Sequence, residues 1–297
     1  MTPVTRNSAR SAAQALRSSV AVARPDRLVG VEHEYEVFHD GSKIDFRQLV
    51  GTLDGLGPHL DPGDRNARRN AWGGITTADG AEAEIAIAPV CVAPGFSLDA
   101  IAAVADGEAL LRLELSRERG KLPGSGYRLA GYSTHISVSV PDRAAPQIAR
   151  DLARRFAPAL GLLLDNEHSP GLLIRPRYAR LEVCGDHLDG DRLRAALIAT
   201  VAFVVAAETL PRRRLPPELR LHVERAKERH GWYVDRSASG RDLYAGGRLT
   251  PLLTRRGSSC TAQQVLEQCW GIARVLVSSL LAADELGHVD AVVLGTP

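Results

Sequence analysis

The chain has 297 residues and a mass of 31.9 kDa, enough for one large or two modest domains. Hydrophobic residues make up 44% of the sequence and charged residues 24%, which excludes a chain that is disordered throughout. The formal net charge is +2 and the basic residues are spread along the sequence, so the composition predicts no nucleic-acid partner.

The four cysteines show neither CxxC pairing nor regular spacing, which argues against a zinc ribbon or a disulfide framework and favours a reducing cytoplasm. The most apolar stretch, Ala195–Ala207, is shorter than the ~20 residues that a membrane span needs. We therefore expect this stretch to be a buried helix, and the protein to be cytoplasmic and soluble with no membrane partner.

The N-terminus differs in composition from the rest of the chain. Residues 1–25 contain arginine, serine and alanine but no acid, which resembles a transit peptide and is more typical of a loose or helical tail. No internal repeat or low-complexity linker follows. The sequence therefore predicts a basic tail over residues 1–27, open to disorder, and a single domain over 28–297.

Hydrophobic periodicity predicts an α+β fold, because segments of period two alternate with segments of helical period. In chain order we expect strands at Leu28–Phe38 and Ala81–Val90, a helix capped by Ser97, a strand at Ser133–Val140, a helix at Ala144–Leu164, a strand at Tyr178–Cys184, and helices at Asp191–Thr209 and Thr261–Glu285. The polar tract Asp61–Gly74 is predicted to be a mobile loop, either a lid over a substrate or a surface insertion.

The predicted strands share an unusual feature, since the polar face of each offers acids or histidine. Successive strand side chains point to opposite faces, so residues of equal parity lie together. In one sheet with its apolar side on helices, the other side would gather six metal-ligating side chains, which are Glu32, Glu34, Glu82, Glu84, His135 and Glu182. For any single strand, the alternative to a metal site is that its polar side chains simply face solvent.

This many carboxylates on one face require a cation. Oxygen ligands with one imidazole suit Mg²⁺ or Mn²⁺ better than structural zinc, and two such cations could hold a nucleotide phosphate. Arg175, Arg177 and Arg180 lie just before Glu182, and guanidinium groups bind phosphate in bidentate fashion. They are candidates for stabilising a phosphoryl group in transfer, although Arg175 and Arg177 would equally fit exposed surface positions.

These motifs, in this order, resemble the carboxylate-amine ligase superfamily, which contains glutamine synthetase, the glutamate-cysteine ligases and smaller amidoligases. The resemblance covers most of residues 28–190 and rests on GVEHEY at Gly30–Tyr35, DGAEAEIAIAP at Asp79–Pro89, THISVSV at Thr134–Val140 and RLEVC at Arg180–Cys184. It implies a curved, mainly antiparallel sheet of glutamine-synthetase catalytic-domain type, with helices packed on one face and the active site on the other.

The resemblance also implies roles for single residues. It makes metal ligands of Glu32, Glu34, Glu84 and Glu182, with Glu82 as a further candidate. His135 would serve the metal that holds the nucleotide phosphates, and Ser137 on the same strand would contribute to the nucleotide site. Arg180 would contact phosphate, with Arg175 and Arg177 as further catalytic arginines.

The function implied by the resemblance is an ATP- and Mg²⁺-dependent ligase that joins a small-molecule carboxylate to an amine through an acyl phosphate. The resemblance favours glutamate as the carboxylate substrate, with another amino acid or a peptide as alternatives. The oligomeric state is left open, a homo-oligomer included. Residues 28–297 would then be one compact amidoligase domain.

Two departures keep other functions open. Cys184 stands where relatives commonly have a second arginine, and the spacing is more compact than that of glutamine synthetase. The alternatives are a guanidino-kinase-like phosphotransferase, a metal-dependent hydrolase that needs no ATP, and a non-catalytic nucleotide-binding relative. No residue is singled out as the general base, although Glu36 and Asp79 are available.

Overall fold

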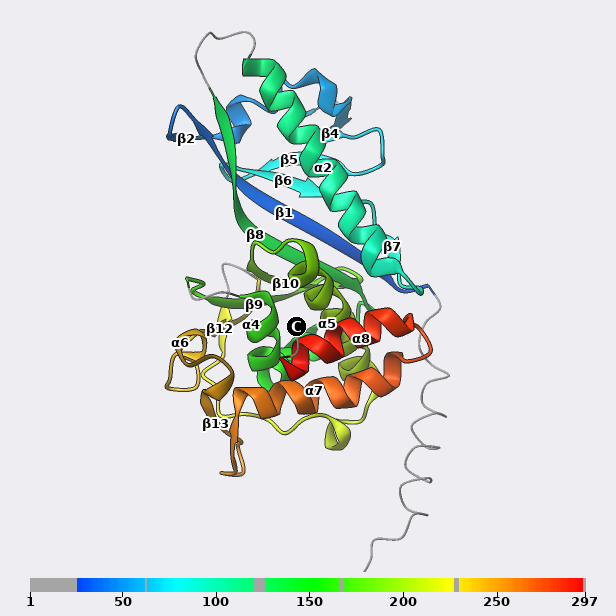
Figure 1. The fold of residues 1–297 in the computed structure, drawn as a ribbon, viewed down its shortest axis with the longest axis vertical. Helices are drawn as coiled ribbons and strands as arrows, with labels where there is room; N and C mark the ends of the chain where they lie inside the picture. Colours follow the sequence, from blue (N-terminus) through cyan, green and yellow to red (C-terminus); the bar gives the residue numbers. More distant parts are fainter. Residues whose placement is uncertain (1–25, 62, 120–125, 166–167, 227–229, 296–297) are drawn as a thin grey trace, which may run out of the picture.

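The structure is a computed structural model that describes residues 26–61, 63–119, 126–165, 168–226 and 230–295. Its largest feature is a sheet in which all the described strand pairs are antiparallel (Figure 1). The predicted α+β class with a mainly antiparallel sheet is therefore confirmed. Residues 1–25 of the predicted tail lie outside the described residues, and Arg27 is buried with its guanidinium donating to Ser139 O at 2.8 Å.

The central strands are those that the alternating polar pattern predicts. The spatial order of the sheet is β11-β12-β9-β10-β8-β1-β6-β5-β4-β3, with β2 and β7 paired to β1. The strands are β1 (Leu28–His39), β2 (Ser42–Ile44), β3 (His59–Asp61), β4 (Asp64–Arg69), β5 (Ile75–Asp79), β6 (Glu82–Ala86), β7 (Val90–Cys91), β8 (Tyr127–Ser139), β9 (Gly171–Arg177), β10 (Arg180–Asp186), β11 (Glu224–Ala226) and β12 (Gly231–Asp235), with β13 (Pro251–Leu253) and β14 (Ser259–Thr261) forming a separate hairpin.

The helices gather in two places. Figure 1 shows α2 alongside the β1, β5 and β6 end of the sheet, while α4, α5, α7 and α8 gather near β9 and β10. The helices are α2 (Phe96–Arg119), α3 (Ala145–Asp151), the π-helix η3 (Leu152–Phe156), α4 (Ala157–Leu164), α5 (Gly190–Thr209), α6 (Leu243–Gly246), α7 (Ala262–Val277) and α8 (Ala283–Leu294), with 3₁₀ turns η1 (Phe46–Gln48), η2 (Asp54–Leu56), η4 (Arg212–Arg214) and η5 (Gly247–Leu249). No described helix is both long and apolar enough to cross a membrane.

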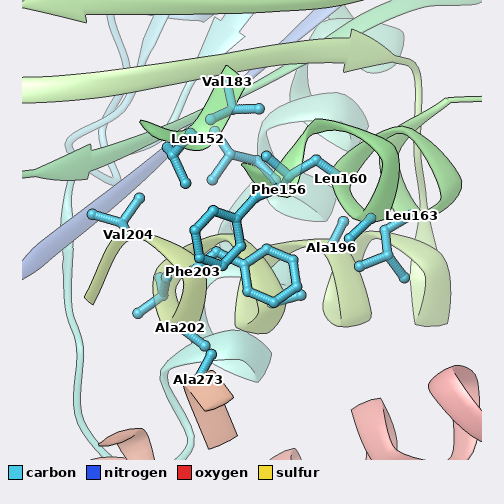
Figure 2. Packing of buried hydrophobic residues seen from close by; sticks show 14 of the residues in the cluster. Leu152, Phe156, Leu160, Leu163, Val183, Ala196, Ala202, Phe203, Val204 and Ala273 are labelled. Carbon is cyan, nitrogen blue, oxygen red and sulfur yellow. The ribbon is translucent and has the colours of Figure 1, made fainter. Parts of the chain in front are cut away.

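Apolar strand residues and helices form the main hydrophobic core. Val31, Ile136 and Val183 point away from the acidic side chains of their strands and belong to one buried cluster with α3, η3, α4, α5 and α7. Figure 2 shows Phe156 and Phe203 packed against each other in this cluster, with ring centroids 5.2 Å apart. The strand parity read from the sequence therefore separates the core side chains from the polar ones.

A smaller core lies under the second half of α2. It contains Tyr35, Ile85 and Leu111, together with side chains of the 46–56 segment. Gly107 allows the helix to approach closely, because a Cβ at this position would lie 2.6 Å from Ile85 and 3.0 Å from Trp72. Packing on β6 therefore requires glycine in the middle of α2, despite its low helix propensity.

The mobile loop or lid predicted for Asp61–Gly74 is wrong. This tract contains β4, which pairs with β3 and β5, and it buries Ala67, Arg68 and Asn70. The guanidinium of Arg68 donates to the carbonyl groups of Val50, Gly51 and Gly57. The high charge of the tract made the strand unpredictable from the sequence. Arg68 is buried and satisfies backbone carbonyls, but from the sequence alone it cannot be told from a surface arginine.

This arrangement predicts the effect of removing Arg68. Arg68→Ala leaves buried carbonyl oxygens without donors, so we expect the free energy of unfolding to fall by about 1–3 kcal/mol. Urea titration followed by circular dichroism measures it. Arg69→Ala is the matched control, because Arg69 is exposed on the same strand and should change stability by less than about 0.5 kcal/mol. Equal losses in both variants would contradict the assignment.

Other expected boundaries also differ. The N-cap expected at Ser97 is wrong, because α2 begins at Phe96 and includes Ser97. The helix expected over Thr261–Glu285 is two helices, since α7 ends at Val277 and α8 begins at Ala283. Its start is confirmed, because Thr261 caps α7 in a capping box with Gln264. The strand expected from Tyr178 begins at Arg180, because Ala179 adopts a positive φ of 54° in the turn that joins β9 to β10.

Candidate active site

Five candidate metal ligands from four neighbouring strands come together on the polar side of the sheet. In the strand register Glu32 lies opposite His135 on β8, and Glu34 lies opposite Glu84 on β6. Glu182 on β10 lies opposite Ser137 on β8. We call Glu32, Glu34, Glu84, His135, Glu182 and Asp79 the acidic cluster.

His135 is at the centre of the acidic cluster and is 7% exposed. Its Nδ1 lies 3.3 Å from Glu32 Oε2 and 3.6 Å from Glu182 Oε1, and its Nε2 lies 3.8 Å from Glu34 Oε1. Burial acts to lower the pKa of His135, but the surrounding carboxylates outweigh it and raise the pKa above its ordinary value. Ser133 donates to Glu34 and lies 3.2 Å from His135 Nε2.

The acidic cluster offers two cation positions that share Glu84. Glu32, Glu84 and His135 each place a ligand atom within 4.8 Å of the others, and so do Glu34, Asp79 and Glu84. A third group of this kind joins His135 and Glu182 to Cys184. Burial raises the pKa of the Cys184 thiol, which keeps it a neutral thiol in the protein without a cation.

Three carboxylates of the acidic cluster have no lysine or arginine partner in the part of the chain that the structure describes. Within the described residues no lysine or arginine forms an ion pair with Glu32, Glu34 or Glu84. Burial, and then the charges of Glu32, Glu34 and Asp79, raise the pKa of Glu84 to about 8. Burial also raises the pKa of Glu34. An oxygen-rich site of this charge fits a hard divalent cation such as Mg²⁺.

The raised pKa of Glu84 predicts a pH dependence. Between pH 4.5, where the unfolded carboxyl titrates, and about 8, the folded protein holds a proton that the unfolded chain has lost. The metal-free protein therefore loses stability as pH rises through this window. A cation must displace that proton, so Mg²⁺ affinity should rise between pH 6 and 8 by at most about tenfold per unit. Calorimetric titration at several pH values tests this, and a flat affinity would contradict it.

Glu182 differs from the other acids because two arginines hold it. Arg175 Nη2 donates to Oε1 at 2.7 Å, and Arg177 Nε donates to Oε2 at 2.8 Å. Burial acts to raise the pKa of Glu182, but Arg175, Arg177 and His135 outweigh it and hold the pKa below its ordinary value. The two arginines lie on β9, the neighbour of β10, which places both beside the acidic cluster.

Glu82 lies apart from the acidic cluster. Its carboxylate accepts from Lys43 Nζ at 2.8 Å, and the same ammonium donates to Glu36 at 2.8 Å. Burial acts to raise the pKa of Glu82, but Lys43 outweighs it and the pKa is lowered. Glu36 and Glu82 therefore form an ion-pair group around Lys43, although both share the strand parity of the cluster.

A hollow of about 440 Å³ opens beside Glu32 at one end of the acidic cluster. Its walls are largely apolar, with Leu28, Ile75 and Pro89 among the lining residues. The predicted nucleotide residues Ser137 and Arg180 both line it. The Oγ of Ser137 is buried without a hydrogen-bond partner, and Arg180 is exposed. We call this hollow pocket A.

A second hollow, pocket B, opens at the other end of the acidic cluster and has a volume of about 360 Å³. Glu34, His135 and Cys184 line its inner side, while Asp186 and Tyr233 lie on its wall. The acidic cluster thus stands between two hollows, one next to Glu32 and one next to Glu34. Each is within the size range of small-molecule sites.

No protein-family model matches the sequence, and no curated protein matches it either. Among solved structures, that of the complex between the prokaryotic ubiquitin-like protein Pup and its ligase PafA matches with a TM-score of 0.57 at 15% identity, over 93% of this chain. The fold of this chain is similar to that of the ligase PafA, so the resemblance predicted from the sequence is confirmed at the level of the fold alone.

The chain spans 65% of the length of the matched PafA chain. Apo GmaS and a glutamine synthase homolog also match, with TM-scores of 0.39 and 0.32 at 14% and 12% identity. These two matches cover 94% and 95% of this chain and 71% and 69% of theirs. The PafA match alone describes the fold at 15% identity, and the chemistry must be argued from the residues of the site.

Sequence reasoning missed two polar members of the site. Asp79 was considered only as a base, but it lies on β5 within ligand distance of Glu34 and Glu84. Ser133 was not singled out, although it shares the parity of His135 and stands two residues before it. Strand parity would have found Ser133, whereas Asp79 depends on how β5 pairs with β6.

Proposed function

We propose that the chain is an ATP- and Mg²⁺-dependent carboxylate-amine ligase, that is, an amidoligase. The observation that carries the proposal is the acidic cluster, in which Glu32, Glu34 and Glu84 lie between two hollows with no lysine or arginine paired to them in the described part of the chain. Carboxylates arranged in this way need cations, and cations between two hollows can bridge the substrates held in each.

The cation positions are assigned to overlapping residues. Glu32, Glu84 and His135 would hold the Mg²⁺ or Mn²⁺ next to pocket A, with Glu182 beside them, and Glu34, Asp79 and Glu84 would hold the one next to pocket B. Glu182 serves the first position while Arg175 and Arg177 fix its orientation. When bound, the cations neutralise phosphate charge and polarise the transferred phosphoryl group.

Pocket A is assigned to the nucleotide. Its apolar walls suit a base, and the unpaired hydroxyl of Ser137 offers a hydrogen bond to it. Arg180 at the rim of pocket A supplies a guanidinium for the phosphates. Pocket B then receives the carboxylate, a free amino acid such as glutamate or a peptide, and the amine approaches from the same side.

The reaction has two steps. An oxygen of the substrate carboxylate attacks the γ-phosphorus of ATP, which gives an acyl phosphate and ADP. The amine then attacks the acyl carbon, a proton is lost, and phosphate leaves as the amide forms. Arg175, Arg177 and Arg180 stabilise negative charge on the transferred phosphoryl group, and the walls of the two pockets limit hydrolysis of the acyl phosphate by water.

The remaining predictions about organisation belong to the same proposal. Residues 28–297 form one catalytic domain whose sheet is curved, with its helices on one face and the active site on the other. The enzyme works in the cytoplasm on small-molecule substrates.

Hydroxylamine trapping tests this function, because it converts an acyl phosphate into a stable hydroxamate. With Mg²⁺, ATP and a panel of amino acids, we expect ADP and a hydroxamate for at least one carboxylate, detected by mass spectrometry. Omitting Mg²⁺ should abolish both products. ADP with a phosphorylated acceptor would instead indicate a phosphotransferase, and turnover without ATP would indicate a hydrolase.

A further inference from the structure

An arginine-lined hollow lies apart from the acidic cluster, next to the β13–β14 hairpin that stands at the lower end of Figure 1. Its volume is about 510 Å³. Five arginines and a single acid line it, which are Arg155, Arg212, Arg213, Arg255, Arg256 and Glu218. None of these residues lines pocket A or pocket B. We call it the arginine hollow.

The floor of the arginine hollow is a fixed part of the fold. Arg155, on the π-helix η3, is 8% exposed and donates to Pro216 O at 2.6 Å and to Glu218 Oε1 at 3.2 Å. Backbone hydrogen bonds join Leu219 N to Arg154 O at 3.1 Å and Arg255 N to Glu218 O at 2.8 Å. The arginines are therefore held on connected backbone before any ligand arrives.

The arginine hollow carries an excess of positive charge. Glu218 is shared between Arg155 and Arg255, whose Nε lies 3.1 Å from Glu218 Oε2. Asp151 lies 3.4 Å from Arg212 Nε and is the other carboxylate in reach. Within the described residues neither Arg213 nor Arg256 has an acidic partner. Five guanidinium groups thus stand against two carboxylates.

We propose that the arginine hollow binds a small, diffusible polyphosphate. Guanidinium groups present paired N–H donors that match phosphate oxygens, and a ligand with two or more phosphates can engage Arg213 and Arg256 together. The hollow has the volume of a small-molecule site. The inference is independent of the proposed ligase function, because no residue of the acidic cluster contributes to it.

Isothermal titration of the full chain with inorganic tripolyphosphate, in buffer containing EDTA, tests this site. We expect saturable binding that weakens at least tenfold in Arg213→Gln/Arg256→Gln. Both arginines are exposed, so the variant should fold, which circular dichroism checks. Arg192→Gln/Arg241→Gln removes the same charge from exposed positions outside the hollow and should bind like wild type.

Four results would overturn the proposal. The first is no binding of tripolyphosphate by the wild-type protein at millimolar concentration, and the second is equal weakening in the two double variants. The third is tighter binding of a single-stranded oligonucleotide, which would assign the arginine hollow to nucleic acid. The fourth is weakened binding in Arg180→Gln, because Arg180 lines pocket A and such a loss would place the tripolyphosphate there instead.

Discussion

Glu84→Gln is expected to stabilise the metal-free protein and to weaken its response to Mg²⁺ and ATP. Burial and the charges of Glu32, Glu34 and Asp79 oppose ionisation of Glu84. A neutral amide removes that repulsion, so at pH 8 the free energy of unfolding should rise by on the order of 2 kcal/mol. The same change removes the oxygen charge that both proposed cation positions share.

Thermal unfolding measures both effects of Glu84→Gln. For the wild-type protein, Mg²⁺ and ATP at ~100 times the dissociation constant should add about 2.7 kcal/mol, a midpoint rise of roughly 5–10 °C. Without ligand, the Glu84→Gln variant should unfold at a higher midpoint temperature than wild type, and Mg²⁺ with ATP should raise that midpoint only a little. A gain equal to that of wild type would contradict the assignment of Glu84, and opposite changes in the two conditions cannot come from misfolding.

Glu82→Gln is the matched control for this experiment. Glu82 lies two residues before Glu84 on β6, and its carboxylate is held by Lys43. We expect this variant to keep the Mg²⁺-dependent rise in midpoint. Loss of the rise would return Glu82 to the set of metal ligands that the sequence predicts.

Phe203→Ala is expected to lower the free energy of unfolding by about 3–5 kcal/mol. Phe203 is completely buried on α5, where its ring packs on Phe156 between the helices and the sheet (Figure 2). The dense surroundings cannot collapse into the space that the ring leaves, so a cavity remains. Urea titration measures the loss.

A surface position provides the control for Phe203→Ala. Val275 is 43% exposed on α7, so Val275→Ala should change stability by less than about 0.5 kcal/mol. A loss under 1 kcal/mol in Phe203→Ala would show that the main core is loosely packed. It would also contradict the packing of α5 between the sheet and α7.

The alternating pattern of the central strands was enough to predict much of the site. Glu32, Glu34, His135 and Glu182 share a face because side chains in a strand alternate with period two. The same rule sends Val31, Ile136 and Val183 to the core. This information is local, so it can be obtained from the sequence without knowledge of the fold.

The same rule failed where pairing between strands decides the contacts. Glu82 and Glu84 share a parity, but Lys43 on β2 engages Glu82 while Glu84 faces Glu34. The sequence predicts a loop where the charged strand β4 lies, because the carbonyl groups that satisfy Arg68 come from residues 11 to 18 positions away. Such partners cannot be read from local periodicity.

The sequence by itself determined the fold class and the polar faces of the central strands, and it predicts a cation among their carboxylates, because each follows from local spacing and charge. Only the tertiary structure decided that Asp79 joins Glu34 and Glu84, that Arg175 and Arg177 hold Glu182, and that a hollow opens at each end of the acidic cluster. These contacts join side chains on different strands, and strand order and register are set by long-range pairing and packing.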